Sequence, residues 1–239
     1  MLKFSGVLLV VGIFLSSPLY SRADPDTSLA HFPTKLIDDL PHLFITENAV
    51  PFVVGGFAAA GDWAVLDSRN SFQQPLANLN IQPVFDLGNF YGEGWVEGFG
   101  AVGSWSLGAL TQDARLQEFG RDASESLVLA TVVVTGLKYS INRTRPDGGP
   151  YSFPSGHTIT AFCFAPVINH YAGTGAGIAA YALGTVTALA RMEGNHHYLS
   201  DVLAGATLGF VIGNAVVYTP KDVSVSVGPG QMELKLAFN

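Results

Sequence analysis

The chain has few charged residues and almost no cysteine. Charged side chains make up 13% of its 239 residues, and the formal net charge is −7. Because no basic stripe is present that could neutralise a phosphate backbone, we expect no nucleic acid partner. Cys163 is the single cysteine, so no disulfide can form within the chain. Cys163 lies in an apolar stretch, and we expect it to fill space in the core of one sizeable domain.

Metal-binding patterns, internal repeats and low-complexity linkers are also missing from the sequence. No cluster of His, Cys, Asp and Glu has the spacing of metal ligands. We therefore expect no metal and no other cofactor. Four of the few cations are Lys138, Arg143, Arg145 and Arg191. A local positive site in an acidic protein favours a small anionic group as the ligand.

The N-terminus has the pattern of an export signal. Lys3 supplies the positive start, residues 6–15 form a short apolar run, and Ser21 and Ala23 are small residues at the two positions that a signal peptidase needs. The apolar run is too short for a comfortable membrane span. We therefore expect residues 1–23 to be a signal peptide and the mature chain to begin near Asp24. The protein is then expected in the periplasm or at the periplasmic face of the membrane.

Apolar periodicity predicts an all-α helical bundle with a short C-terminal β-hairpin. Residues 24–222 are expected to form one helical domain, with its motif core at 124–218, followed by the hairpin tail at 223–239. The expected helices cover residues 46–66, 90–110 (one helix or a pair), 124–140 with Ser124 as N-cap, 155–171, 178–191 and 198–218, with a loop at 67–86 and a turn at Gly173, Gly175 and Gly177.

Three short stretches contain the chemically informative residues. They run from Lys138 to Pro146, from Pro154 to His157 and from Arg191 to Asp201. Short connections make successive helices antiparallel. The ends of two predicted helices and the starts of two others then fall at the same end of the bundle. The sequence therefore predicts that all three stretches form one site.

The cations and the helix start in these stretches suit a phosphoryl group. Arg145 and Arg191 can each match two phosphate oxygens, whereas Lys138 acts as a point charge. Ser155 and Gly156 open a helix, where free N–H groups and the helix dipole favour an anion. We therefore assign phosphate binding to these residues.

Two histidines supply the reactive groups. His197 and Asp201 are four residues apart at a helix start, so they share one face. A carboxylate on one imidazole nitrogen makes the other nitrogen a better nucleophile, and we expect His197 to attack phosphorus and form a phosphohistidine. His157 is then the acid that protonates the leaving oxygen. Each of these residues alone would have an ordinary structural explanation, but all of them at one end of one bundle would not.

Two neighbouring residues are given lesser roles. Arg143 is expected to support the anion site from its edge. His196 lacks the spacing to Asp201 that His197 has, so we expect it at the rim.

The order and spacing of the three stretches resemble the signature of the type 2 phosphatidic acid phosphatase (PAP2) superfamily, which vanadium haloperoxidases and bacterial class A acid phosphatases share. The resemblance implies an all-helical, metal-free phosphatase with a histidine nucleophile. One difference is Ala190, where members often have Ser before the arginine. Without the serine hydroxyl, one possible hydrogen bond to the phosphate is lost.

The preferred interpretation is a phosphatase for phosphate monoesters or diphosphates, with a lipid phosphate as substrate and the membrane as partner. A soluble periplasmic non-specific acid phosphatase is the alternative, and a vanadium-dependent haloperoxidase or an inactive binding protein ranks lower. Membrane embedding stays open at this stage, since the apolar stretches 178–190 and 202–218 fall short of the roughly 20 residues of a usual span.

Overall fold

The computed structural model describes residue 32 and residues 46–65, 73–217, 223–228 and 231–236. The helices are α3 (Thr46–Val65), α4 (Gln73–Ala77), α5 (Gln82–Tyr91), α6 (Gly94–Thr111), α7 (Ala114–Ile141), α8 (Gly156–Ala172), α9 (Thr174–Glu193) and α10 (Leu199–Val217). The all-helical prediction is confirmed for this body of the chain. The predicted signal peptide and the start near Asp24 lie outside the described residues.

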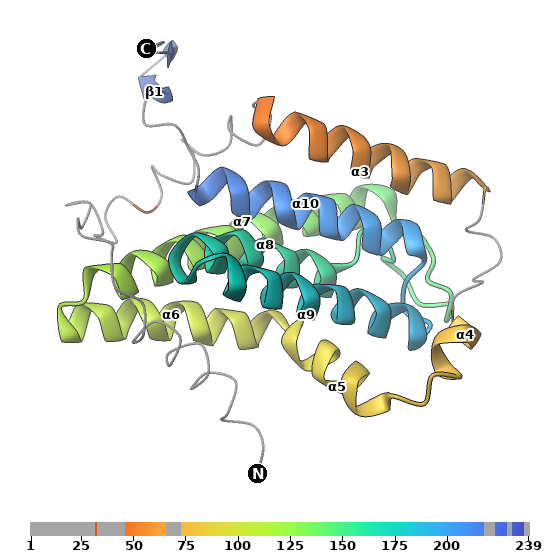
Figure 1. The fold of residues 1–239 in the computed structure, drawn as a ribbon. Coiled ribbons are helices and arrows are strands. Elements are labelled where there is room, and N and C mark those ends of the chain that lie inside the picture. Colours follow the sequence, from red (N-terminus) through yellow and green to blue (C-terminus); the bar gives the residue numbers. More distant parts are fainter. Residues whose placement is uncertain (1–31, 33–45, 66–72, 218–222, 229–230, 237–239) are drawn as a thin grey trace.

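The long helices run roughly along one axis and pack around α8 (Figure 1). Helices α7, α9 and α10 contact α8, α6 packs along α7, α5 packs on α9, and α3 covers α10. Ile159, Cys163 and Val167 of α8 are fully buried and join the main core with Phe119 and Ile212. The prediction that Cys163 fills space in the core is therefore confirmed.

Close helix contacts depend on glycine at two interfaces. On α10, a Cβ added at Gly209 would lie 2.5 Å from the carbonyl oxygen of Ile159, so only glycine lets α10 approach the backbone of α8 this closely. The contact between α3 and α10 has the same character, because a Cβ at Gly55 would overlap the side chain of Thr207. These contacts hold α10 close to α8 and α3, and α10 carries part of the site.

Helix α7 begins ten residues before the predicted start at Ser124. Its N-cap is Asp113, whose side chain accepts a hydrogen bond from the backbone N–H of Leu116 at 3.1 Å. The hydroxyl of Ser124 instead donates to the Gly120 carbonyl at 2.7 Å inside the helix. The prediction of the helix start was wrong because a serine can cap a helix or lie inside one. Ser124 lies inside α7, where its hydroxyl bonds to the preceding turn.

Two further boundaries differ from the prediction. The expected loop at 67–86 contains α4 and the first half of α5, which begins with Pro83 in its first turn. The expected turn at residues 173–177 is confined to Gly173, at a φ of 84°, and α9 starts at the next residue. Gly175 and Gly177 lie inside α9. Composition alone therefore made both the loop at 67–86 and the turn at 173–177 longer than they are. Residues 90–110 form a helix pair that breaks near Gly92.

Two strands follow the helices. Strand β1 (Val223–Gly228) and strand β2 (Gln231–Leu236) pair antiparallel, with Val223 opposite Leu236. The residues that would connect them, 229–230, lie outside the described part. The hairpin as a whole therefore stays a prediction.

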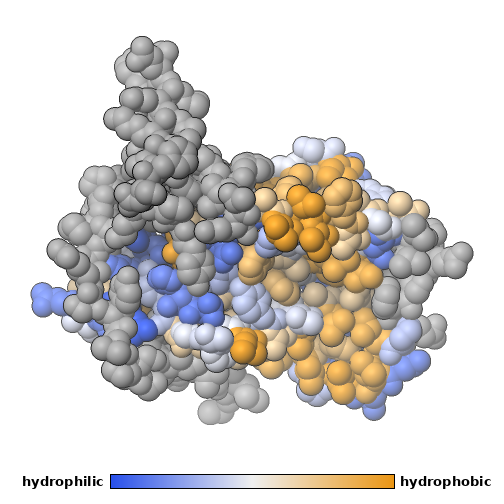
Figure 2. All heavy atoms as spheres, turned by 45° about the horizontal axis from the view of Figure 1, so that its top comes forward, coloured by the Kyte–Doolittle hydropathy of each residue, from blue (hydrophilic) through white to orange (hydrophobic). Residues whose placement is uncertain are grey.

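Many large apolar side chains lie on the outer faces of the helices. Figure 2, which turns the α3 side forward, shows a broad hydrophobic region on this face. Phe57 of α3 is 75% exposed, Phe99 of α6 70% and Val132 of α7 65%. Others are Val50, Val53 and Val54 on α3, Trp95, Val102 and Leu110 on α6, and Tyr139 on α7. By length and composition α7 and α10 could cross a membrane, and α10 is largely buried in the bundle.

Candidate active site

The three motif stretches meet at one end of the bundle, where α7 and α9 end and where α8 and α10 begin (Figure 1). Lys138 lies in the last turn of α7 and Arg191 in the last turn of α9. His157 lies in the first turn of α8, and Asp201 in the first turn of α10. The backbone N–H of Ser155 donates to the Asp201 carbonyl at 3.0 Å, which links the two helix starts.

Asp201 is fully buried and accepts four hydrogen bonds. Its Oδ1 accepts from Arg143 Nη1 at 2.6 Å. Its Oδ2 accepts from Ser152 Oγ at 2.5 Å and from the backbone N–H of Tyr198 at 3.0 Å, and lies 3.4 Å from His197 Nδ1. So many donors keep this carboxylate ionised and fixed in position. Asp201 can therefore hold the proton of His197 on Nδ1, which leaves Nε2 with its lone pair.

His197 is 1% exposed, and its burial has an electrostatic consequence. Desolvation lowers the pKa of His197 to about 4, although its hydrogen bond to Asp201 and the charge of Asp201 act in the opposite direction. The imidazole is therefore neutral near pH 7. A neutral imidazole with an oriented Nδ1–H is the form that can act as a nucleophile.

Lys138, Arg145 and Arg191, called the cation cluster below, lie near this histidine. Their charges act on one another, and those of Lys138 and Arg191 also act on His197. Arg191 Nη1 donates to Asn89 Oδ1 of α5 at 3.0 Å, and Lys138 Nζ donates to the Tyr151 carbonyl at 2.5 Å. Like charges repel at such short range, so the cluster gains stability when an anion lies among its members.

Two buried donors of the cluster are open. The Nε atoms of Arg145 and Arg191 have no hydrogen-bond partner among the residues that the structure describes. A buried unpaired guanidinium N–H costs free energy. A phosphoryl oxygen would supply the missing acceptors.

The start of α8 faces the cluster. The side chain of Ser155 is used as the N-cap of α8 and accepts from Thr158 Oγ1 at 2.9 Å. A Cβ added at Gly156 would meet only ordinary contacts, the nearest being Lys138 Cε at 3.8 Å. The packing of the chain itself therefore does not require glycine at 156. Space for a ligand beside the open helix N–H groups gives glycine a purpose there.

Residues of the α5–α6 junction contact His157 and the first turns of α8. Its Nε2 lies 3.5 Å from Glu93 Oε1, and the hydroxyl of Thr160 donates to the Gly92 carbonyl at 3.0 Å. Burial and the charge of Arg191 lower the pKa of His157, whereas Glu93 raises it. The carboxylate therefore favours the protonated imidazole that a general acid needs.

Arg143 contacts Asp201, its Nη1 lying 2.6 Å from Oδ1. Its guanidinium stacks between the ring of Trp63, 4.3 Å from the centroid, and the ring of Tyr198, at 4.0 Å. It also donates to Ser200 Oγ at 2.8 Å. Planar stacking with two directed hydrogen bonds suits arginine and not lysine. Arg143 therefore positions Asp201.

His196 lies at the rim, 39% exposed, with its Nδ1 2.9 Å from Asp147 Oδ2. The hydrogen bond from the Gly149 N–H and the contact with His196 lower the pKa of Asp147. Within the described ranges, no group of three or more His, Cys, Asp or Glu is arranged to hold a metal ion.

Sequence reasoning missed Glu93, Asn89, Trp63 and Ser152. Ser152 lies between two motif stretches, so its closeness in sequence to both could have marked it as a candidate. The other three come from α3, α5 and the α5–α6 junction, and no local spacing links them to the motifs. Only packing brings them to the site.

The fold and the site define a helical protein with a buried histidine–carboxylate pair beside clustered cations at a helix start. Residues 120–224 match the family model described as the PAP2 superfamily. This match confirms, over residues 120–224, the resemblance seen in the sequence.

Two curated proteins are similar to part of this chain. Lipid A 1-phosphatase of Porphyromonas gingivalis is 38% identical over 96 residues, which cover 38% of this chain and 22% of the relative. Phosphatidylglycerophosphatase B of Bacillus subtilis is 32% identical over 92 residues, covering 32% of this chain and 45% of the relative. The matched region thus spans less than half the length of each curated relative.

Two solved structures are also similar. The crystal structure of Aquifex aeolicus LpxE aligns with a TM-score of 0.47 at 22% identity, over 56% of this chain and 83% of that one. The transmembrane PAP2 type phosphatidylglycerolphosphate phosphatase from Bacillus subtilis aligns with a TM-score of 0.49 at 21% identity, over 72% and 94%.

Proposed function

We propose that this protein is a metal-independent phosphatase that hydrolyses a phosphate monoester or diphosphate of a lipid at a membrane surface. The observation that carries the proposal is the buried His197–Asp201 pair beside a cation cluster with open donors. A neutral, oriented imidazole next to an anion site suits attack on phosphorus.

In the first step, Nε2 of His197 attacks phosphorus and the bond from phosphorus to the leaving oxygen breaks. The cation cluster and the N–H groups at the start of α8 neutralise the charge on the equatorial oxygens. His157 gives its proton to the leaving oxygen, so the lipid alcohol, or the lipid monophosphate from a diphosphate, departs with that proton. The phosphoryl group remains on His197.

In the second step, neutral His157 takes a proton from a water molecule as the water oxygen attacks phosphorus. The bond from phosphorus to Nε2 breaks, inorganic phosphate is released, and both histidines return to their starting states. Asp201 keeps the proton of His197 on Nδ1 throughout, and it stabilises the positive charge that the imidazole carries in the phosphohistidine.

A lipid is the preferred substrate because of the surface that surrounds the site. The outer faces of α3, α6 and α7 expose large apolar side chains on several sides of the bundle. Apolar surface of this extent is typical of contact with lipid or protein. The curated relatives, named as phosphatases of lipid A and of phosphatidylglycerophosphate, act on phosphate carried by a lipid. The export signal expected at the N-terminus favours the periplasmic face of the membrane.

The proposal is tested with purified protein in detergent. Phosphate release from phosphatidic acid, phosphatidylglycerophosphate and a polyprenyl diphosphate is compared with release from glycerol phosphate and nucleotides, each with and without EDTA. We expect higher kcat/KM values for lipids and no effect of EDTA. Equal turnover of soluble esters would favour the acid phosphatase alternative. Bromide oxidation by peroxide after vanadate loading, without hydrolysis, would favour the haloperoxidase.

A further inference from the structure

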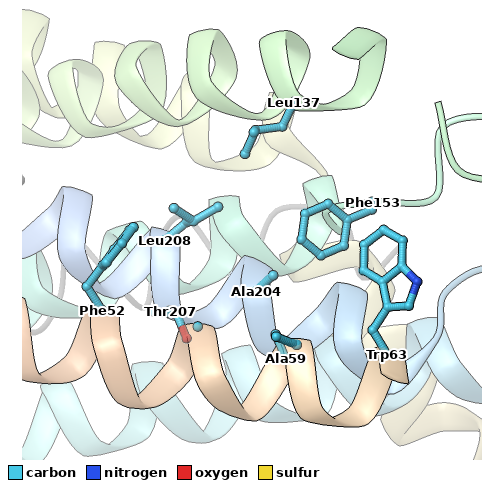
Figure 3. A pocket seen from close by; sticks show the side chains of 10 residues that line it. Phe52, Ala59, Trp63, Leu137, Phe153, Ala204, Thr207 and Leu208 are labelled. Atoms are coloured by element: carbon cyan, nitrogen blue, oxygen red, sulfur yellow. The ribbon is translucent and has the colours of Figure 1, made fainter. Parts of the chain in front are cut away.

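An apolar cavity of about 260 Å³ lies between α3, α7 and α10 (Figure 3). Phe52 and Gly56 of α3 line it on one side, and Ala204 and Leu208 of α10 on another. Leu137 of α7 points towards the same space (Figure 3). The lining is almost wholly apolar, so the cavity fits a hydrocarbon chain and offers little to a polar ligand.

The cavity reaches the candidate active site at one end. Trp63 and Phe153 lie there with their ring centroids 5.0 Å apart (Figure 3). The other contact of Trp63 is Arg143, whose Nη1 donates to Asp201 at 2.6 Å. Leu137 directly precedes Lys138, a member of the cation cluster. Through Trp63, Phe153 and Leu137, the lining of the cavity therefore adjoins segments that carry residues of the site.

The direction and length of the cavity match a lipid tail. Its lining on α3 extends from Phe52 to Trp63, a distance of about 16 Å at 1.5 Å per residue. That is about the depth of one leaflet, half of a hydrocarbon core of roughly 30 Å. The cavity follows the bundle axis, which is the direction of acyl chains if the bundle stands in the membrane with its site at the surface.

The cavity is also accessible from the side. Phe52, on its lining, is 40% exposed, and Gly56 lies on the exposed part of α3. A Cβ added at Gly56 would have nothing within 4 Å. A chain could therefore enter between α3 and α7 from the surrounding lipid, without threading through the bundle.

We propose that this cavity is the subsite for one acyl or prenyl chain of the substrate. The inference rests on the proposed function and deepens it, because it assigns the lipid tail to a defined place beside Trp63 and Phe153. Each methylene group buried there raises kcat/KM about fourfold, the equivalent of about 0.8 kcal/mol. The tail thereby places the phosphate among the cations.

The test fills the cavity by Gly56→Leu, at a position on the lining where an added Cβ has nothing within 4 Å. Gly61→Leu is the matched control, because Gly61 lies on the same helix, has open space for a Cβ and does not line the cavity. Phosphatidic acids from dihexanoyl to dipalmitoyl are compared in mixed micelles, with p-nitrophenyl phosphate as the substrate without a tail. Thermal unfolding of each variant reports its folding.

We expect Gly56→Leu to lower kcat/KM for dipalmitoyl phosphatidic acid about tenfold or more and to flatten the dependence on chain length. Activity on p-nitrophenyl phosphate and all activities of Gly61→Leu should match the wild type. If Gly56→Leu keeps the wild-type dependence on chain length, the cavity does not hold the substrate tail, although the proposed function stands. The same result with loss of a co-purifying lipid would assign the cavity to a structural lipid and also overturn the inference. A wild-type protein that hydrolyses no lipid phosphate would remove the proposed function itself.

Discussion

Glu93 Oε1 lies 3.5 Å from Nε2 of His157, so a carboxylate from the start of α6 reaches the proposed general acid. Glu93 is half-exposed and His157 is more buried. The pair connects the α5–α6 segment, which lies outside the region matched by the superfamily, to the first turn of α8. We infer that Glu93 sets how much of His157 is protonated at a given pH.

Glu93→Gln should move the alkaline limb of the kcat/KM profile to lower pH. Glu93 raises the pKa of His157, so its removal lowers that pKa and leaves less protonated acid as the pH rises. The shift should appear for alkyl phosphates, whose leaving oxygen needs a proton, and should be small for p-nitrophenyl phosphate. Asp86→Asn on α5 removes one exposed negative charge as well and serves as the control. Equal shifts for both variants would mean that Glu93 acts through net charge alone.

His197→Ala should abolish turnover, because among the described residues only this imidazole pairs with Asp201. Rapid acid-free quenching of the wild type with ³²P-labelled substrate should trap phosphate on a histidine peptide that contains residue 197. His157→Ala should retain the trapped species and lose about 10²–10⁴-fold in rate for poor leaving groups. Label on any other residue would contradict the assignment of the nucleophile.

The acid limb of kcat/KM should lie near pH 4. Desolvation lowers the pKa of His197 to about 4, and below this pH the proton occupies the nitrogen that must attack phosphorus. Burial and Arg191 lower the pKa of His157 from its usual 6.5, so its protonated form is lost at a lower pH than usual as the pH rises, and activity on alkyl phosphates should peak at acid pH. The profile is measured at constant ionic strength. An acid limb above pH 6 would mean that His197 is not desolvated as the structure indicates.

The sequence was sufficient to predict those parts of the site whose residues lie close together in the chain. His197 and Asp201 are one helical turn apart, and Ser155 caps the helix that begins at the next residue, so spacing alone brings each set together. The meeting of the three stretches followed from the antiparallel order of short-looped helices. For these residues, local geometry and chain topology leave few other arrangements.

The remainder depends on packing that spacing does not encode. Glu93, Asn89 and Trp63 reach the site because α5 packs on α9 and α3 packs on α10. The contact of α3 with α10 depends on the packing of Gly55 against Thr207. No periodic pattern in the sequence indicates that these two residues meet. The stacking of Arg143 on Trp63 could not be predicted for the same reason, since Trp63 lies far away in the chain.

Arg143→Lys should lower kcat about tenfold with little change in KM. A lysine cannot stack flat between Trp63 and Tyr198. It also cannot donate to Asp201 and Ser200 in the same stacked geometry, so the carboxylate of Asp201 loses its fixed position. Trp63→Phe keeps an aromatic face and should retain most of the activity. A raised KM with unchanged kcat would instead mean that Arg143 acts in substrate binding.

Vanadate should inhibit competitively, because its five-coordinate adduct with His197 resembles the transition state of phosphoryl transfer. Arg191→Ala should weaken vanadate inhibition more than inhibition by product phosphate. We expect this difference because the buried Nε of Arg191 has no acceptor among the described residues, and the five-coordinate adduct carries more charge on its equatorial oxygens than product phosphate does. Asn89→Ala, which frees Nη1 of Arg191 but keeps the guanidinium, should have a smaller effect in the same direction. Inhibition constants for both ligands are measured at one pH and salt concentration. Equal losses for vanadate and phosphate would mean that Arg191 attracts the substrate without favouring the transition state.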